Sequence, residues 1–395
     1  MEIIMTEKKH TEIDLQGECA LGFESVRDAL AESFVSRDEI GSAICVYFEG
    51  KKVVDLWGGY VDGAQNHPWK ANTLCLMYSV AKSICSLSVH MLADRGQIDL
   101  EAPIAEYWPE FAQAGKEEIK VRHFLSHWCG VWANDRAIAG DIYDPEAMEK
   151  VIAMQSPAWP IETQGAYNTV NIGFIANEIV RRVTDKSIQN FIADEITKPL
   201  GVDYYLGVPE NALDRCAEII ANPADQVRAA GRDPDSPVVA AWKAFPKNFG
   251  PTEQNSYRFR TAGVPSFGGF GEARAMAKIY AVLAEGGELD GVRLLSSNGI
   301  RRAIETQWSD MHEGLFDRPL SMSMGFMKNP PDGKPLFTSF ADSFGHMGSG
   351  GARAFAVPSK RLSGCFVSNY QSEGRGIGER TEAFVKAVEE SVALP

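Results

Sequence analysis

The sequence predicts an α+β protein with an antiparallel sheet that is flanked by terminal helices and interrupted by an inserted, mainly helical lobe. Three observations predict this: a hairpin pattern at 44–57, a second group of strand patterns at 323–369, and a long helical stretch between them. Strands from both chain ends must meet to bury their apolar faces. We therefore expect one domain, 1–395, with an α/β lobe at about 20–70 and 270–395 and a helical lobe at about 71–269.

The N-terminal part supplies the first helix and the hairpin. Residues 1 to about 20 are polar, and we expect a loose arm. The spacing of the apolar residues at 23–34 predicts a helix. Two apolar segments, 44–48 and 53–57, flank a turn at 49–52, which predicts a hairpin.

The middle of the chain has mostly helical patterns. An apolar helix is expected from Ser79 to Arg95, with Gly96 ending it. Further helices are expected at 121–127, 144–154, 170–183 and 188–196. Residues 201–262 contain many prolines and predict a loop-rich excursion.

The C-terminal part returns to the sheet. A helix is predicted at 272–283, followed by a glycine-rich turn at 286–292. A set of strands is expected to begin at Ser323, and the last helix is expected at 378–392. The neighbouring antiparallel strands of this set are expected at 344–351, 354–357 and 364–369.

The stretch Ser79-Val80-Ala81-Lys82 carries the most chemistry. Residues three apart on a helix share a face, so the Ser79 hydroxyl would lie beside the Lys82 amine. A serine becomes a nucleophile when a neighbour takes its proton, and burial lowers the pKa of a lysine enough to do so. The helix N-terminus adds amide donors suited to an oxyanion.

A purely structural alternative exists for this spacing: Ser79 would cap the helix and Lys82 would extend to solvent. Against it, Lys82 is the only Lys, Arg, Asp or Glu between Lys70 and Asp94, inside a run that is apolar nearly all round. A lysine in such surroundings indicates a specific role.

The net charge, the apolar runs and the cysteine spacing of the chain argue against several kinds of partner and location. The net charge of −14 disfavours nucleic acid and anionic membrane surfaces as partners. The start lacks an apolar core typical of a secretory signal, and no apolar run is long enough for a membrane span. The seven cysteines are scattered singly, without metal-ligand or CxxC spacing. We therefore expect a cytoplasmic protein with reduced cysteines.

His123 and His127 lie one helical turn apart, which is half of a metal-binding pattern. No acidic residue follows the HExxH arrangement and no third ligand is evident. We expect packing or capping roles for both, and no metal.

Three motifs occur in a familiar order: Ser79-Val80-Ala81-Lys82, then Tyr167 at the start of a helix, then His346-Met347-Gly348 on a late strand. With these motifs the chain resembles the serine β-lactamase and penicillin-binding-protein superfamily. Other segments of the sequence agree with this resemblance, namely 94–104, 121–127, 198–201 and 286–296. The resemblance spans about residues 23–392. It is strongest to the class C β-lactamase-like branch and, within that, to the family VIII carboxylesterases.

The resemblance implies roles for individual residues. Ser79 would be the acyl-accepting nucleophile, Lys82 would ease its deprotonation, and Tyr167 would shuttle protons to the leaving group. The amides of Ser79 and Ser349, the latter just after Gly348, would form the oxyanion hole. Which of Lys82 and Tyr167 is the general base stays open, since the two should titrate jointly.

The sequence departs from the family pattern at two places. The Tyr-x-Asn motif becomes Tyr167-Asn168-Thr169, so Thr169 replaces the amide in part or the role is absent. The Lys-Thr-Gly strand begins with His346, which is shorter than lysine and mostly neutral at pH 7. This favours neutral esters, although Arg353 could hold an anion and keeps β-lactam turnover open.

Aromatic and sulfur side chains flank the motifs and are candidates for an acyl or alcohol pocket, with plain core packing as the alternative. They are Trp128, Trp132, Phe267, Phe270 and Met347.

The expected function is that of a serine hydrolase of carboxylic esters, acting through an acyl-enzyme on Ser79 without metal or cofactor. The expected partner is a small-molecule ester, and the oligomeric state is left open. Three alternatives remain: a β-lactamase or D-amino-acid peptidase/amidase, an acyltransferase, and a non-catalytic binding protein. The presence of Ser79, Lys82 and Tyr167 argues against the last.

Overall fold

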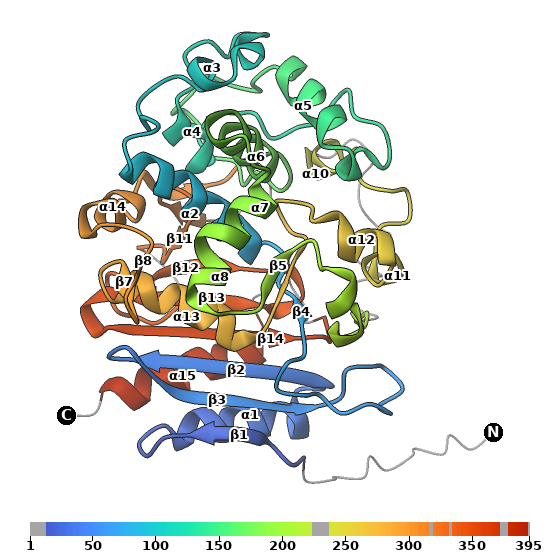
Figure 1. Ribbon diagram of the computed structural model, residues 1–395, viewed down its shortest axis with the longest axis vertical. Coiled ribbons are helices and arrows are strands. Elements are labelled where there is room, and N and C mark those ends of the chain that lie inside the picture. Colours follow the sequence, from blue (N-terminus) through green and yellow to red (C-terminus); the bar gives the residue numbers. More distant parts are fainter. Residues whose placement is uncertain (1–12, 223–236, 316–318, 332–333, 372–377, 394–395) are drawn as a thin grey trace.

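A central antiparallel sheet organises the computed structural model, which describes residues 13–222, 237–315, 319–331, 334–371 and 378–393. Nine described strands form the sheet in the order β1-β3-β2-β14-β13-β12-β11-β10-β9, every neighbour antiparallel (Figure 1). N-terminal and C-terminal strands meet at the β2–β14 pair. The strands are β1 (Gln16–Cys19), β2 (Gly41–Phe48), β3 (Lys51–Gly59), β9 (Trp308–His312), β10 (Pro319–Met322), β11 (Met327–Lys328), β12 (Phe344–Met347), β13 (Arg353–Val357) and β14 (Leu362–Ser368).

Helices cover both faces of the sheet. Helix α13 (Ala273–Ala284) packs on one face against β2, β13 and β14. The terminal helices α1 (Glu24–Ser36) and α15 (Glu379–Ala393) pack together on the other (Figure 1). Strand side chains alternate between faces, so β2, β13 and β14 each contribute apolar residues to two clusters, one on each face. This is the α+β architecture, an antiparallel sheet flanked by the terminal helices, that the sequence predicts.

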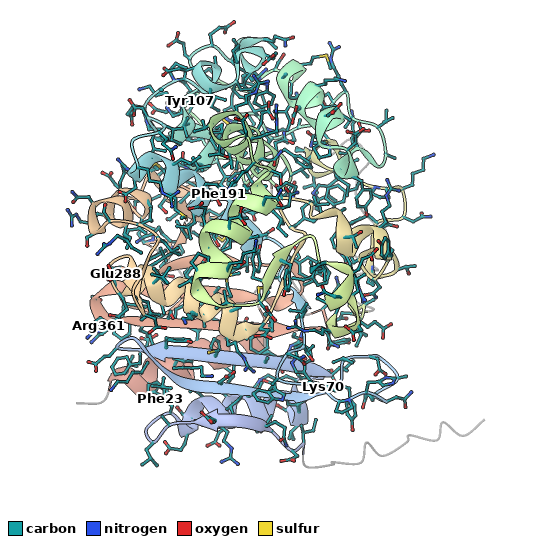
Figure 2. The ribbon with its side chains drawn as sticks, viewed as in Figure 1. Phe23, Lys70, Tyr107, Phe191, Glu288 and Arg361 are labelled. Carbon is teal, nitrogen blue, oxygen red and sulfur yellow. The ribbon has the colours of Figure 1, made fainter. Side chains whose placement is uncertain are left out.

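Between β3 and α13 the chain forms a mainly helical region, much of which lies at the opposite end of the molecule from β1 (Figure 1). Its helices and short strands are α2 (Val80–Asp94), α3 (Ile104–Tyr107), α4 (Val121–Leu125), α5 (Pro145–Met154), α6 (Asn171–Thr184), α7 (Ile188–Ile192), α8 (Lys198–Leu200), α10 (Pro237–Ala241), α11 (Pro251–Gln254), α12 (Tyr257–Ala262), β4 (Cys75–Leu76), β5 (Tyr204–Leu206) and β6 (Gly269–Gly271). Figure 2 shows Tyr107 in this part, whereas Phe23 and Lys70 lie at the strand end.

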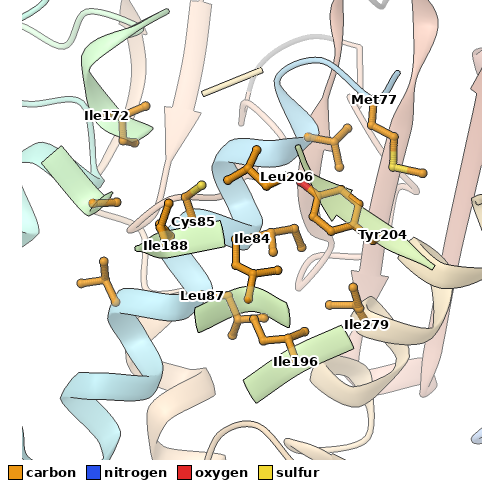
Figure 3. Packing of buried hydrophobic residues seen from close by; sticks show 14 of the residues in the cluster. Met77, Ile84, Cys85, Leu87, Ile172, Ile188, Ile196, Tyr204, Leu206 and Ile279 are labelled. Carbon is orange, nitrogen blue, oxygen red and sulfur yellow. The ribbon is translucent and has the colours of Figure 1, made fainter. Parts of the chain in front are cut away.

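Helix α2 is the central element of the core. All of its residues except the last, Asp94, are buried, because it packs against α6, α7, α14 (Ser297–Ala303) and β12. Figure 3 shows its residues Ile84, Cys85 and Leu87 among apolar side chains from α7 and β5. Because α2 is buried on all sides, its packing fixes the position of its first turn, where Ser79 and Lys82 lie.

Most elements match the expectations within a few residues, and four differ. The polar arm contains β1, which pairs with β3 from Gln16↔Trp57 to Cys19↔Val54. The C-terminal strands begin before Ser323, with β9 and β10, and the segment at Ser323 is a turn. The expected helix at 188–196 changes at Ala193 into a π-helical turn.

The fourth difference is a small sheet, β4-β6-β5, that the sequence patterns do not reveal. Its strands are only two or three residues long, too short for a visible alternation. Part of the expected loop-rich excursion, 223–236, lies outside the described residues. None of the helices in the described ranges has the length and apolar character that a bilayer-crossing segment needs.

Candidate active site

A sharp strand-to-helix turn presents Ser79 at the start of α2. Tyr78, between β4 and Ser79, has a left-handed φ of 48°, which is unfavourable for a residue with a Cβ. The Tyr78 hydroxyl donates to Gln254 at 3.2 Å and accepts from Gln371 at 2.9 Å, so contacts far apart in sequence hold this conformation. The Ser79 side chain makes no capping bond, which contradicts the purely structural alternative.

Lys82 lies against the Ser79 hydroxyl. Its Nζ donates to Ser79 Oγ at 3.0 Å and to the carbonyl oxygen of Ser266 at 2.9 Å. The side chain is 0% exposed and does not reach solvent. Burial lowers the pKa of Lys82 to about 7, because the ammonium loses its hydration. A substantial fraction of this amine is therefore neutral near pH 7 and able to accept a proton.

Ser266 is a site residue that the sequence analysis missed. It lies in the loop before β6. The strand β6 is joined to the segment before Ser79 by a hydrogen bond, in which Met77 N donates to Gly269 O at 2.9 Å. The Ser266 hydroxyl accepts from Gly173 N at 2.9 Å and donates to the Val170 carbonyl at the start of α6. Lys82 donates to the backbone carbonyl of Ser266 and not to its side chain, so no side-chain motif could have indicated this contact.

Tyr167 lies beside the lysine. Its side chain is buried, and Lys82 Nζ is 5.3 Å from the centroid of its ring. His127 stacks against the same ring at a centroid distance of 5.0 Å. The structure thus brings together Ser79, Lys82 and Tyr167, which are far apart in sequence.

The two residues after Tyr167 have different surroundings. Asn168 is buried and caps α6: its Oδ1 accepts from Asn171 N at 2.7 Å, and its Nδ2 donates to Val131 O at 2.6 Å. The Thr169 hydroxyl oxygen accepts from Trp242 Nε1 at 3.2 Å. Within the described chain the hydrogen bonds of Lys82 go to Ser79 and Ser266, so Thr169 does not take the place of the family's amide toward the lysine.

The end of β12 packs directly on the turn that carries Ser79. A Cβ at Gly348 would lie 2.4 Å from Met77 O and 3.1 Å from Tyr78 Cβ, so only glycine allows this approach. Gly350, with a φ of 86°, would place a Cβ 2.9 Å from the Tyr78 ring. Ser349, between these glycines, is therefore held next to the start of α2, with its side chain exposed.

His346 lies on the site-facing side of β12. It is 0% exposed, and its ring centroid is 6.0 Å from that of Tyr167. Its Nδ1 is 2.8 Å from the Met347 carbonyl, which can only accept, so Nδ1 carries a proton. The position of the family's lysine is thus taken by a fully buried imidazole.

Strand alternation points Met347 and Arg353 to the opposite side of the sheet from His346. Met347 and Arg353 are paired across β12 and β13 and share one side of the sheet. Met347 packs in the apolar cluster that contains Tyr167 and residues of the terminal helices. Arg353 is 1% exposed and interacts electrostatically with Glu382 of α15. Arg353 is therefore buried away from solvent. Met347, which shares its cluster with Tyr167, remains a candidate pocket residue.

The other candidate pocket residues lie in apolar clusters. Half-buried Trp128 packs against the cluster that contains Tyr167 and Trp308. Trp132 and Phe267 are largely buried, and Phe270 is completely buried, so core packing accounts for it.

His123 and His127 each accept a hydrogen bond from a backbone amide. His123 Nδ1 accepts from Lys120 N at 3.1 Å, and His127 Nδ1 accepts from Asn168 N at 2.8 Å. Among the described residues, no group of three or more His, Cys, Asp or Glu side chains is placed to hold a metal ion.

Comparison with known proteins identifies the family. A model of the Beta-lactamase family matches residues 26–387. The chain belongs to the beta-lactamase family. The chain is similar to the esterase/beta-lactamase LipL of Mycobacterium tuberculosis. The two are 31% identical over 365 residues, which cover 88% of this chain and 81% of LipL.

Several solved structures are similar to this protein over nearly its whole length. A family VIII carboxylesterase superposes with a TM-score of 0.88 at 33% identity, covering 96% of this chain and 100% of its own. A penicillin-binding-protein homologue from Caulobacter crescentus gives 0.86 at 30% identity, with coverages of 96% and 100%. EstA from Arthrobacter nitroguajacolicus gives 0.84 at 27% identity, with coverages of 96% and 99%. These matches confirm the resemblance, and the chain is a serine hydrolase of the beta-lactamase fold.

Proposed function

We propose that this beta-lactamase-family protein hydrolyses carboxylic esters through an acyl-enzyme intermediate on Ser79. The observation that supports this most directly is the 3.0 Å contact between Lys82 Nζ and Ser79 Oγ, with the lysine fully buried. A buried amine with a pKa of about 7 can remove the serine proton near neutral pH.

In the acylation step, Ser79 Oγ attacks the ester carbonyl carbon and its proton passes to the Lys82–Tyr167 pair. The negative charge that develops on the carbonyl oxygen is stabilised by the backbone amides of Ser79 and Ser349. The C–O bond to the alcohol then breaks, and Tyr167 returns the proton to the leaving alkoxide.

In the deacylation step, water attacks the Ser79 ester and gives its proton to the same pair. The second tetrahedral intermediate collapses, the carboxylic acid leaves, and Ser79 regains its proton. The reaction is balanced without metal or cofactor, and the partner is a small-molecule ester. Lys82 is the better-supported acceptor in acylation, because it already bonds to Ser79 Oγ.

The substrate class follows from the charge at the substrate-binding strand. A β-lactam carries a carboxylate, which the family's strand lysine helps to hold. Here His346 is fully buried, and Arg353 lies on the other side of the sheet. Neither offers an exposed cation, which favours neutral esters. The names of two relatives, a family VIII carboxylesterase and EstA, support an esterase activity.

β-Lactam hydrolysis is the second candidate, favoured by the similarity to LipL, whose name joins esterase and beta-lactamase. Incubation with a short-chain nitrophenyl ester and with a chromogenic cephalosporin separates the two candidates. We expect rapid ester turnover and slow cephalosporin turnover, since neither His346 nor Arg353 offers an exposed cation to the cephalosporin carboxylate. Faster turnover of the cephalosporin would refute the esterase proposal.

The pH dependence of ester hydrolysis reports on Lys82. The burial-lowered pKa of about 7 means that the amine is protonated below this value and neutral above it. We expect kcat/KM to rise with pH through an apparent pKa near 7 and then to level off. Initial rates from pH 5.5 to 9 measure this. A flat profile across that range would show that no group with this pKa acts as the base.

A further inference from the structure

His127 is a second histidine in the site whose contacts the proposed chemistry does not use. It follows α4 with a left-handed φ of 59°, a conformation that costs energy for a residue with a Cβ. It is 2% exposed. The strained backbone brings both its carbonyl and its ring to the segment that carries Tyr167.

Three consecutive amides around Tyr167 are held by only two residues. Ala166 N donates to the His127 carbonyl at 3.0 Å, and Asn168 N donates to His127 Nδ1 at 2.8 Å. Between them, Tyr167 N donates to the buried Glu313 carboxylate at 2.9 Å. His127 therefore fixes the backbone on both sides of the tyrosine.

The His127 ring also fixes the tyrosine side chain. The two rings are stacked at a centroid distance of 5.0 Å and an interplanar angle of 30°. Stacking restricts rotation of the Tyr167 ring, whose centroid is 5.3 Å from Lys82 Nζ. One residue thus contacts the preceding amide, the ring and the following amide.

The chemical state of His127 suits this task. Its Nδ1 accepts a hydrogen bond, so the neutral ring carries its proton on Nε2. Burial, and then the charge of Lys82, hold the pKa of His127 well below its usual range. The ring therefore stays neutral and keeps its Nδ1 acceptor throughout the pH range in which the Lys82 amine titrates.

We propose that His127 is a positioning residue for Tyr167, one that holds the phenol in register with Ser79 and Lys82 for proton transfer. This inference rests on the proposed function, because it assigns His127 no role apart from that of Tyr167. The alternative is that His127 is simply a core residue on which the fold depends. His123, one turn earlier, bonds to the Lys120 amide away from the catalytic residues and is the matched comparison.

Two substitutions separate the contacts. His127→Ala removes the Nδ1 acceptor and the stacked ring. His127→Asn restores an acceptor near the position of Nδ1, and asparagine tolerates the left-handed φ. We expect His127→Ala to lower kcat for a nitrophenyl ester by roughly 10- to 100-fold with KM within about three-fold, since small displacements of a catalytic group have such effects. His127→Asn should recover a large part of kcat, whereas His123→Ala should change thermal stability and leave kcat near the wild-type value.

A double-mutant cycle with Tyr167→Phe provides the decisive test. If His127 acts through Tyr167, His127→Ala has little further effect on kcat once the hydroxyl is gone, so the two losses do not multiply. A role in the fold alone would lower kcat by the same factor in both backgrounds. Multiplicative losses, or equal kcat losses in His123→Ala and His127→Ala, would overturn the inference and leave the esterase proposal intact. Full activity of Tyr167→Phe would instead overturn the role of Tyr167 in the proposed function, and the inference with it.

Discussion

Ser79→Ala is expected to abolish ester hydrolysis, lowering kcat by at least about 10⁴-fold, because no acyl-enzyme can form without the hydroxyl. The change removes one atom at the start of α2, where Ser79 makes no capping bond, so the fold should be retained. Steady-state rates with a nitrophenyl ester, together with circular dichroism, measure both effects.

Ser88→Ala is the matched control. Ser88 lies on the same helix, and among the described residues its hydroxyl bonds only to the Ile84 carbonyl within α2. We expect this variant to keep the wild-type rate. Ester turnover that survives Ser79→Ala at the wild-type level would show that another residue is the nucleophile.

The second large effect is expected for Lys82→Met. Methionine has similar length and tolerates burial, but it supplies neither a proton acceptor nor a positive charge. We expect kcat/KM to fall by about 10³-fold, within the usual contribution of a positioned acid–base group. The rise of activity through a pKa near 7 should disappear in the residual rate. Persistence of that rise would assign it to another group.

Lys116→Met is the matched control, since Lys116 is also 0% exposed. Its ammonium donates to the carbonyls of Gln113, Ala153 and Gln155, each at 2.7 Å, and it lies in the helical region away from Ser79. Its replacement leaves buried carbonyls without a donor, at about 1–3 kcal/mol each in the free energy of unfolding. We expect a lower melting temperature but an unchanged pH profile of activity.

The sequence was sufficient for features that depend on local spacing. Helix α2 begins and ends where expected, because Ser79 precedes a continuous apolar run and Gly96, with a φ of 71°, ends it. The Ser79–Lys82 contact follows from their helical spacing alone. The hairpin of β2 and β3 follows from strand alternation around a Glu49-Gly50 turn.

Features that depend on distant partners could not be predicted in this way. The strand β1 is polar, and it is recognised only through its pairing with β3. The lysine's second acceptor is the backbone carbonyl of Ser266, 184 residues away. The direction of Met347 and Arg353 depends on which face of β12 meets α2, and the sequence pattern of a strand buried on both faces does not show this. The contacts of His127 with the Tyr167 segment depend on a left-handed φ, which is uncommon for residues other than glycine and cannot be read from the sequence pattern.

The central claim is that Ser79 is an activated nucleophile, and covalent labelling tests it most directly. The wild-type protein is treated with a fluorophosphonate, its intact mass is measured, and the modified peptide is sequenced by mass spectrometry. The account predicts one adduct per chain on Ser79, absent in Ser79→Ala and much slower to form in Lys82→Met. An adduct on another serine, or none on a folded protein, would contradict it.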